Sequence, residues 1–262
     1  MANKILKILV IGDTHDSPDI PDKSRFGWFA KHIRKTKPDA VVQIGDFATF
    51  DSCTHYIRDD SYTAKIDKPI FMKDIESLDS AMEEFKYHLK DYKVKKYLTL
   101  GNHERRMWRK EDSNPTFYGM CQKEFFGTCK KYDWEVIPYG KYLMLGGVGF
   151  IHAPINPMGK EYGGEASERQ VANKSKIDIV FGHSHRAQDN RVSKISPIKN
   201  DFTRIINVGC AMPHNHIESY AKHSLTGWTY QICELKIWDN HIQEVNNISM
   251  QTLERDYGKK KS

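Results

Sequence analysis

The sequence predicts an α/β fold, and two observations carry this prediction. First, short and nearly continuous apolar segments at residues 5–11, 40–44 and 96–100 are each followed or closed by a glycine, a pattern typical of buried parallel strands. Second, the segments between them, 26–34 and 74–92, carry apolar residues at three- and four-residue steps, which is helical spacing. Strand, helix and strand in this order form a parallel βαβ unit, and ligands bind where such strands end.

The remaining elements follow in chain order. Residues 134–151 alternate in polarity and contain four glycines, which predicts hairpin strands. A helix is expected at 165–175, and another buried strand at 177–181 ends at Gly182. The last part of the chain predicts antiparallel strands at residues 204–208, 229–237 and 242–248.

Neither an internal repeat nor a linker interrupts the sequence, so we expect a single domain over residues 1–262. Two segments should decorate its rim. Residues 47–70 show no clear periodicity, and residues 104–130 mix basic and aromatic side chains. Long irregular segments in compact domains commonly serve function.

The composition of the sequence restricts the class of protein to which it can belong. Hydrophobic residues make up 39% of the 262 residues, enough for a packed core. The net charge of +6 permits an anionic substrate and weakly favours a polyanion, although a solvated surface is the more common explanation of such an excess. The five cysteines show no C-x-x-C spacing, which argues against a disulfide framework and a structural zinc site. Without a signal-like or membrane-length apolar run, we expect a cytoplasmic protein with no membrane partner.

Metal-capable side chains follow five predicted strands. Alone, a Gly-Asp pair is usually a turn, and a single histidine is usually a hydrogen-bonded core residue. Their ordered combination at strand ends is better explained by one shared site, because the ends of neighbouring strands converge. The motifs are Gly12-Asp13-Thr14-His15, Gly45-Asp46, Gly101-Asn102-His103-Glu104, His152 and Gly182-His183-Ser184-His185.

The chemistry of these side chains indicates which metals they would hold. A mixture of carboxylate, imidazole and amide oxygen suits Mn²⁺, Fe or Zn²⁺ better than a soft thiolate site would. Two such ions, about 3.5–4 Å apart, can clamp a phosphoryl group and activate water, with one carboxylate bridging them. We therefore expect two divalent cations, with Mn²⁺ favoured and Fe, Zn²⁺ or Ni²⁺ as alternatives.

This motif set resembles the calcineurin-like metallophosphoesterase superfamily, over residues 13–185. The resemblance implies a four-layer αββα sandwich of two mixed sheets flanked by helices, and hydrolysis of a phosphate ester. It also implies that His103 is the general acid, with Asp46 and Glu104 orienting or polarising it. The implied metal ligands are Asp13, His15 and His185 for the first ion, Asp46 as the bridge, and Asn102, His152 and His183 for the second ion.

The sequence departs from the pattern of some members of the superfamily, and these departures indicate which members it is more similar to. Protein phosphatases carry G-D-x-x-D-R-G, whereas Gly45-Asp46 is followed here by Phe-Ala-Thr-Phe-Asp-Ser, with no matching arginine. The segments G-D-F and Y-L-T-L-G-N-H-E-R-R are more similar to phosphoesterases encoded by bacteriophages and bacteria. A phage protein would act in the cytoplasm of its host.

Three hypotheses for function remain open at this stage. The favoured one is a phosphodiesterase acting on nucleic acid or nucleotides, such as a nuclease, because of the positive net charge. A phosphomonoesterase is the alternative, and a scaffold that keeps the fold without catalysis is the third. Retention of His103 beside every ligand argues against the scaffold, which has no need of an acid for the leaving group.

Four residues are candidates for binding the substrate. Arg105 and Arg106 lie near Trp108 and could grip phosphate, although a solvated helix over a core tryptophan explains them as well. Lys160 and Tyr162 lie between two ligand-bearing strands, where they could form a wall beside the substrate. The expected partner is a phosphate ester such as DNA or a nucleotide.

Overall fold

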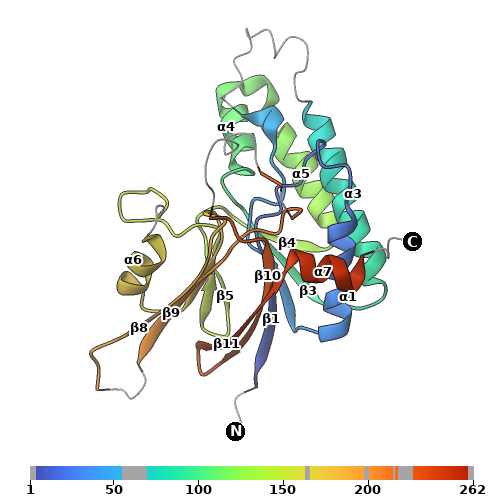
Figure 1. The fold of residues 1–262 in the computed structure, drawn as a ribbon. Coiled ribbons are helices and arrows are strands. Elements are labelled where there is room, and N and C mark those ends of the chain that lie inside the picture. Colours follow the sequence, from blue (N-terminus) through green and yellow to red (C-terminus); the bar gives the residue numbers. More distant parts are fainter. Residues whose placement is uncertain are drawn as a thin grey trace.

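The computed structural model describes residues 4–54, 70–162, 166–197, 201–214, 216–217 and 227–258. Within them, two mixed β-sheets face each other, and helices cover the outer face of each sheet (Figure 1). Three separate clusters of buried apolar residues fill the three interfaces between these layers. The predicted four-layer αββα sandwich is therefore confirmed.

The first sheet has six strands in the order β11-β10-β1-β2-β3-β4. Strands β1 to β4 are parallel, and β10 and β11 extend the sheet in antiparallel fashion beside β1. The bounds are β1 (Leu6–Ile11), β2 (Ala40–Gln43), β3 (Lys95–Thr99), β4 (Trp134–Ile137), β10 (Gln231–Trp238) and β11 (His241–Ser249).

The second sheet has five strands in the order β5-β6-β7-β9-β8. Its central strands β6, β7 and β9 are parallel, whereas β5 and β8 are antiparallel edge strands. The bounds are β5 (Leu143–Leu145), β6 (Val148–Phe150), β7 (Ile179–Phe181), β8 (Ala187–Ser193) and β9 (Phe202–Val208).

Helices cover the two sheets unequally, as Figure 1 shows. One helix, α6 (Ser167–Lys174), packs on the five-stranded sheet. The other described helices lie on the side of the six-stranded sheet, together with two short 3-10 turns, η1 (Asp51–Cys53) and η2 (Pro115–Phe117). They are α1 (Ser24–Thr36), α3 (Phe71–Leu89), α4 (Arg105–Ser113), α5 (Met120–Lys131) and α7 (Met250–Tyr257). None of the described helices has the length and apolar character needed to cross a bilayer.

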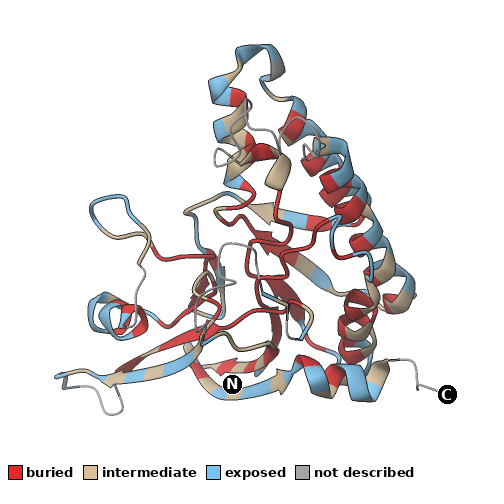
Figure 2. Cartoon of the chain, turned by 45° about the horizontal axis from the view of Figure 1, so that its top comes forward, coloured by how far each residue is buried: buried red, intermediate tan, exposed pale blue. Residues whose placement is uncertain are grey.

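The layering explains why β1 is apolar almost throughout. Side chains of successive residues point to opposite faces of a strand. Leu9 and Ile11 belong to the cluster under the helices, whereas Ile8 and Val10 belong to the cluster between the sheets. Both faces of this strand are therefore buried, as the red central strands of Figure 2 show, and alternation with polar residues is lost.

Helix α3 shows how the predicted helical periodicity is used. Its apolar side chains recur three and four residues apart, so they form one stripe that faces the sheet. Burying each such side chain contributes about 1.5–3 kcal/mol, so the stripe anchors the helix strongly. The stripe consists of Ile75, Leu78, Met82, Phe85 and Leu89, each at most 6% exposed.

The structure corrects the prediction of hairpin strands across residues 134–151. Strands β5 and β6 do form a hairpin, but β4 pairs in parallel with β3 at the edge of the other sheet. The reason is the anchoring of Trp134, whose ring contacts Phe47 and Phe85 in the helix-side core. Sequence alternation alone does not specify which sheet a strand joins.

Other expectations are refined rather than reversed. Residues 104–130 contain helices α4 and α5, and Phe125 and Cys129 of α5 enter the main core. Strand β9 is antiparallel to β8 but parallel to β7. Strand β8 was not predicted because its sequence is polar, as edge strands often are. Of the segment at 47–70, residues 55–69 lie outside the described residues.

A buried carboxyl group ties the chain after β2 to helix α3. Asp74 accepts hydrogen bonds from the Ser52 hydroxyl at 2.5 Å and from the Ser52 backbone N–H at 3.3 Å. Its side chain is only 3% exposed, and burial raises the pKa of Asp74 from its ordinary 3.8 to about 6. The segment around Ser52 is thus held by a carboxyl group whose ionisation lowers the stability of the folded protein.

We expect the substitution Asp74→Asn to remove a pH-dependent loss of stability. The folded carboxyl keeps its proton between about pH 4 and pH 6, where the unfolded chain has lost it, so wild-type stability falls as pH rises through this window. The variant should gain up to ~3 kcal/mol relative to wild type between about pH 4 and pH 7. Urea unfolding at several pH values measures this difference.

The matched control is Glu76→Gln on the exposed side of the same helix, where one ion pair with Lys73 is lost. Its stability difference from wild type should vary little over the same pH range. Equal pH dependence in the two variants would show that burial of Asp74 does not set this loss.

Candidate metal centre

The structure brings all seven predicted metal ligands together at one end of the two sheets. Each follows the carboxyl end of a parallel strand, where open α/β sheets place their ligands. Their donor atoms form a connected set in which each atom lies within 4 Å of another. The residues are Asp13 and His15 after β1, Asp46 after β2, Asn102 after β3, His152 after β6, and His183 and His185 after β7.

The first group consists of Asp13, His15 and His185, whose ligand atoms all lie within 4.8 Å of one another. His185 Nε2 is 3.1 Å from Asp13 Oδ2 and 3.0 Å from His15 Nε2. Burial, reinforced by the neighbouring His103, holds the pKa of His15 well below its ordinary value. His15 is therefore neutral, which is the form that binds metal.

The second group consists of Asp46, Asn102, His152 and His183. His152 Nε2 is 3.3 Å from Asp46 Oδ2 and 3.0 Å from Asn102 Oδ1, and His183 Nδ1 is 2.9 Å from the same amide oxygen. Two ligands at right angles around an ion, each about 2.1 Å away, are separated by about 3 Å. These spacings therefore fit a single ion.

Asp46 lies between the two groups. Its Oδ2 atom is 3.3 Å from His152 Nε2 in the second group and 3.8 Å from His15 Nε2 in the first. The same oxygen thus approaches ligand atoms on both sides. This is the position that a bridging carboxylate would occupy.

A carbonyl group fixes the tautomer of His152. The Ile44 carbonyl oxygen lies 3.0 Å from His152 Nδ1 and can only accept, so Nδ1 carries the hydrogen. The lone pair of neutral His152 is then on Nε2, which faces the oxygens of Asp46 and Asn102. Metal-binding histidines are commonly oriented by such a bond from their other nitrogen.

The charges and lone pairs of the site fit a cation. Asp13 Oδ1 is buried and has no hydrogen-bond partner among the described residues. Although burial by itself would lower it, the carboxylates of Asp46 and Asp13 raise the pKa of His152 to about 10. A site that draws positive charge this strongly can be neutralised by a divalent metal, which the mixed donor set also suits.

Four of the candidate ligands have a left-handed backbone. The φ angles are 42° for His15, 49° for Asp46, 69° for His183 and 59° for His185. Residues other than glycine rarely adopt such angles, and each instance costs of order 1–3 kcal/mol. The fold therefore tolerates a strained backbone at the residues whose side chains converge here, which is a common property of functional sites.

Two glycines allow the carboxylates to pack against the backbone. A Cβ atom at Gly101 would overlap Asp46 Oδ1 and the Asp46 backbone nitrogen, and a Cβ at Gly182 would overlap Asp13 Oδ1. Any larger residue at either position would displace a carboxylate. The glycines of the G-N-H-E and G-H-x-H motifs are thus steric requirements of the site.

Glu104 is a buried clamp for the loop that carries Asp46. Its carboxylate accepts backbone N–H groups from Gly101 at 2.8 Å, Asp46 at 3.0 Å and Phe47 at 2.8 Å. Burial and the nearby charge of Asp46 raise the pKa of Glu104 to about 7. The side chain thus holds together the loops after β2 and β3. Its predicted action on His103 stays a prediction.

His103 lies beside the candidate metal ligands, and each of its ring nitrogens has a hydrogen-bond partner. Its Nδ1–H donates to the Thr49 carbonyl at 3.0 Å, so Nε2 accepts from the Arg106 guanidinium at 3.2 Å. Nε2 is 4.0 Å from Asp46 Oδ2, and the His103 backbone N–H donates to Asp46 Oδ1 at 2.8 Å. His103 also forms a third potential ligand group with His15 and Asp46.

The predicted substrate-binding residues differ in their surroundings. Arg106 donates to the Thr49 carbonyl and to Asp51, in addition to its contact with His103. Arg105 is exposed and stacks over the ring of Tyr139. Tyr162 packs against the α6 cluster, and the described contacts do not join Lys160 to the metal ligands. The substrate-binding roles of these four residues stay predictions.

Sequence patterns did not reveal three residues that contact or influence the site. The Thr49 backbone carbonyl orients His103, and a carbonyl leaves no sequence signal. The Trp228 ring lies 4.6 Å from the His185 ring. Glu161 accepts from the Tyr139 hydroxyl, and its charge acts on the pKa of His183, which burial and His152 nevertheless keep low.

Comparison with known proteins gives one family match. The family model described as calcineurin-like phosphoesterase matches residues 6–187, which is more than half of the chain and contains every candidate ligand. None of the curated proteins matches significantly.

Several solved structures are similar at low sequence identity. A predicted phosphoesterase from Streptococcus pneumoniae has 14% identity and a TM-score of 0.37, covering 95% of this chain and 91% of its own. Yfce, a phosphoesterase from E. coli, has 12% identity and a TM-score of 0.38, covering 93% and 100%. Zn²⁺-complexed Vps29 from Entamoeba histolytica has 11% identity and a TM-score of 0.36, covering 94% and 99%.

We expect Gly101→Ala to damage the centre by steric overlap. The added methyl group would push the Asp46 side chain and backbone out of place. Overpacking of this kind costs about 1–3 kcal/mol, and the variant should also retain less Mn²⁺ after dialysis than wild type. Urea unfolding and elemental analysis by mass spectrometry measure the two effects.

Gly127→Ala is the matched control, because Gly127 lies within α5 and a Cβ atom there would meet nothing within 4 Å. Alanine should stabilise this helix by about 0.5–1 kcal/mol and leave the metal content unchanged. If the two variants behave alike, Gly101 is not required by the packing of Asp46.

Proposed function

The chain belongs to the calcineurin-like phosphoesterase family, and from this premise we propose that it is a two-metal phosphodiesterase acting on a nucleotide or nucleic acid. Family membership supports a phosphoesterase hydrolase in general. The diester, the substrate and the number of metal ions are our proposal. We further propose that the chain is a single domain that acts in the cytoplasm, that of a bacterial host if the protein is encoded by a phage.

The observation that carries the proposal is the position of Asp46 between two sets of convergent donor atoms. We assign Asp13, His15 and His185 to one ion and Asp46 to both. Asn102, His152 and His183 complete the second set. The donor set of carboxylate, imidazole and amide favours Mn²⁺, with Fe, Zn²⁺ or Ni²⁺ as alternatives.

Bound divalent cations would supply charge neutralisation for the phosphoryl group and a lowered pKa for water. The protein itself would supply proton transfer and positioning. His103 is held by Thr49 with its Nε2 atom directed toward Asp46. Once Arg106 turns from Nε2 to the phosphoryl group, Nε2 can carry a proton and give it to the leaving oxygen. Glu104 keeps the Asp46 loop in place through its backbone hydrogen bonds.

Arginine side chains near His103 would bind the phosphate. Arg106 is already within 3.2 Å of His103 Nε2, so a small movement would bring its guanidinium to a phosphoryl oxygen. Arg105 is exposed and begins the same helix, α4. Lys160 and Tyr162 remain proposed as part of a wall on the opposite side of the substrate.

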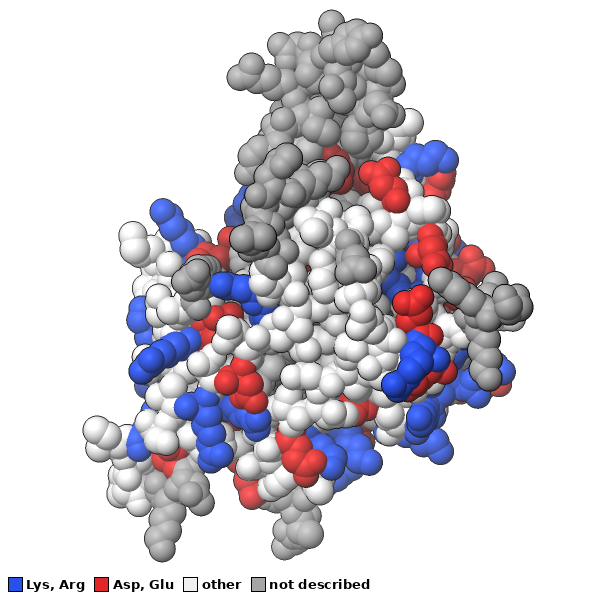
Figure 3. Space-filling model, viewed as in Figure 1, with Lys and Arg blue, Asp and Glu red and all other residues white. Residues whose placement is uncertain are grey.

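Surface charge bears on the size of the substrate. On the face in Figure 3, basic and acidic side chains are interspersed around a largely uncharged central area, and the described residues of this face form no continuous basic track. A long nucleic acid needs a series of phosphate contacts. The described residues of this face therefore offer no extended surface for a long nucleic acid.

A phosphomonoesterase is the second candidate, because the same metals and the same acid serve both reactions. A non-catalytic scaffold is the third. The presence of His103 beside the candidate ligands argues against the scaffold, since a scaffold needs no acid for a leaving group.

A panel of substrates with Mn²⁺ tests the proposed function. We expect hydrolysis of bis-p-nitrophenyl phosphate to exceed that of p-nitrophenyl phosphate, and chelation with EDTA to abolish both activities until Mn²⁺ is restored. Linear single- and double-stranded DNA complete the panel. Activity on the monoester alone would refute the diester proposal, and no activity on any substrate would favour the scaffold.

We expect His103→Ala to bind metal normally but to lose activity on esters with poor leaving groups. A general acid contributes about 10²–10⁴-fold, and this contribution matters least when the leaving group is p-nitrophenolate. Steady-state kinetics on an alkyl and a p-nitrophenyl diester, with metal analysis of each sample, measure the effect.

The contrasting variant is His152→Ala, which removes a proposed ligand and should lower metal content. If His103→Ala loses metal to the same extent, His103 acts as a ligand in the group it forms with His15 and Asp46, and its role as an acid is wrong.

A further inference from the structure

A cavity of about 570 Å³ lies beside the metal centre, between helices α4 and α5 and the carboxyl ends of β3 and β4. Its volume is typical of small-molecule sites. Leu100 and Arg105 line it, and they directly flank the motif from Gly101 to Glu104. Since consecutive Cα atoms are 3.8 Å apart, Leu100 is within about 8 Å of Asn102. A ligand at the Leu100–Arg105 end of the cavity would therefore lie close to a residue that would hold a metal ion.

Aromatic side chains form much of the cavity wall. Trp108 of α4 and Phe126 of α5 both line it, with ring centroids 5.9 Å apart and planes at 87°. Phe126 is 39% exposed, so part of its side chain remains accessible to a ligand. Tyr139, after β4, adds a third ring. With the two planes nearly perpendicular, one ring can stack on the face of a flat heterocycle while the other contacts its edge.

The polar groups of the cavity are suited to a ligand with N–H donors and a phosphate. Asp112 is exposed and offers a carboxylate. The Gln122 amide nitrogen donates to Glu111, which leaves the amide oxygen as an acceptor. Arg105 supplies a positive charge at the end nearest the G-N-H-E motif. Acceptors beside aromatic rings and a cation next to the G-N-H-E motif match the two ends of a nucleotide.

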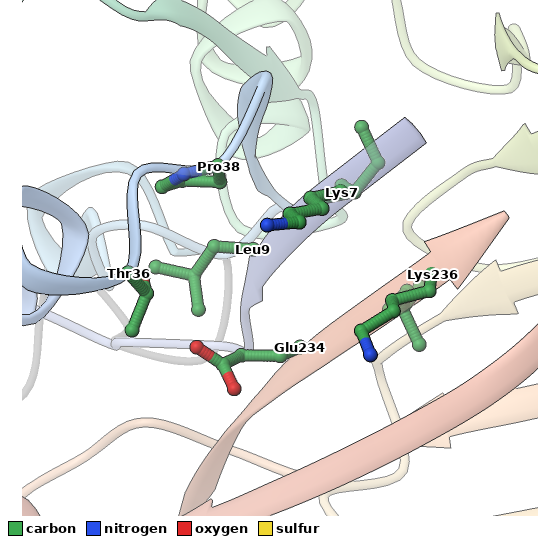
Figure 4. A pocket seen from close by; sticks show the side chains of 8 residues that line it. Lys7, Leu9, Thr36, Pro38, Glu234 and Lys236 are labelled. Carbon is green, nitrogen blue, oxygen red and sulfur yellow. The ribbon is translucent and has the colours of Figure 1, made fainter. Parts of the chain in front are cut away.

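Another hollow of the molecule lacks these features. The one shown in Figure 4, about 280 Å³, is lined by Lys7, Glu234 and Lys236 near the amino end of β1. It therefore lies at the opposite end of the strand from Asp13, and it contains no aromatic side chain. Nearness to the metal ligands and aromatic walls occur together at the α4–α5 cavity.

We propose that the α4–α5 cavity binds the base of a nucleotide whose phosphate lies at the metal centre. This inference rests on the proposed function and makes it specific, because a diester that carries a base should be preferred over one that does not. The Trp108 ring stacks on the base, the perpendicular Phe126 ring meets the edge of the base, Asp112 accepts its N–H groups, and Arg105 contacts the phosphate or ribose.

Two diesters with the same leaving group test the proposal. They are the p-nitrophenyl ester of thymidine 5′-monophosphate, which carries a base, and methyl p-nitrophenyl phosphate, which carries none. With wild-type protein and Mn²⁺, kcat/KM for the nucleotide ester should exceed that for the methyl ester at least tenfold. Trp108→Leu should reduce this ratio about tenfold, because base stacking is lost, and Trp108→Phe should retain most of it.

Two variants guard against effects on folding. Asp112→Ala changes an exposed residue and should lower the ratio, whereas Arg109→Ala, exposed on the same helix but outside the cavity, should keep it. A wild-type ratio near one, or an unchanged ratio in both Trp108→Leu and Asp112→Ala, would overturn the proposal.

Failure of the proposed function is distinguishable from failure of the pocket. If neither ester is hydrolysed, the proposed function fails, and titration calorimetry with AMP and Mn²⁺ then tests the cavity directly. Binding by wild type that is lost in Trp108→Leu and retained in Arg109→Ala would uphold the cavity as a nucleotide site. Absence of binding to wild type would overturn it.

Discussion

The rest of the structure depends on one constraint, the burial of the Asp46 carboxylate between two groups of imidazoles. Taking such a charge out of water costs several kcal/mol unless positive charge compensates it. Although burial alone would raise it, the surrounding histidines, led by His152 and His103, hold the pKa of Asp46 well below its ordinary value. The carboxylate is therefore charged, and a divalent cation bound here would replace the histidines as its compensating charge.

The fold meets this constraint by distributing its parts over both sheets. Asp46 follows β2 in the six-stranded sheet, whereas His152 follows β6 in the five-stranded sheet. The cluster of apolar residues between the sheets, which includes Val42 and Phe150, sets their separation. The apolar packing between the sheets thereby determines how far apart the charged residues lie at the end of the sheets. Glu104 links the loop after β3 to the Asp46 loop, because its carboxylate accepts backbone N–H groups from both.

Much of this could be predicted from the sequence, for physical reasons. Strands buried on both faces leave continuous apolar runs, and the strand-end motifs contain every residue that the structure brings together in the two candidate groups. What escaped prediction depends on tertiary contacts. The parallel pairing of β4 follows from where the Trp134 ring packs, and the orientation of His103 follows from the Thr49 carbonyl. Neither a packing partner nor a backbone carbonyl is encoded in local periodicity.

In the proposed function, helix α4 would link the metal centre to the binding of the base. It begins directly after Glu104, and Arg105, Trp108 and Asp112 are three and four residues apart, so they share one face. Met107 and Glu111 are buried on another face. Because the helix is rigid and buried on that second face, a base held by the first would be positioned relative to His103 at a fixed distance. Binding energy gained at the base can then orient the phosphate, which raises kcat as well as lowering KM.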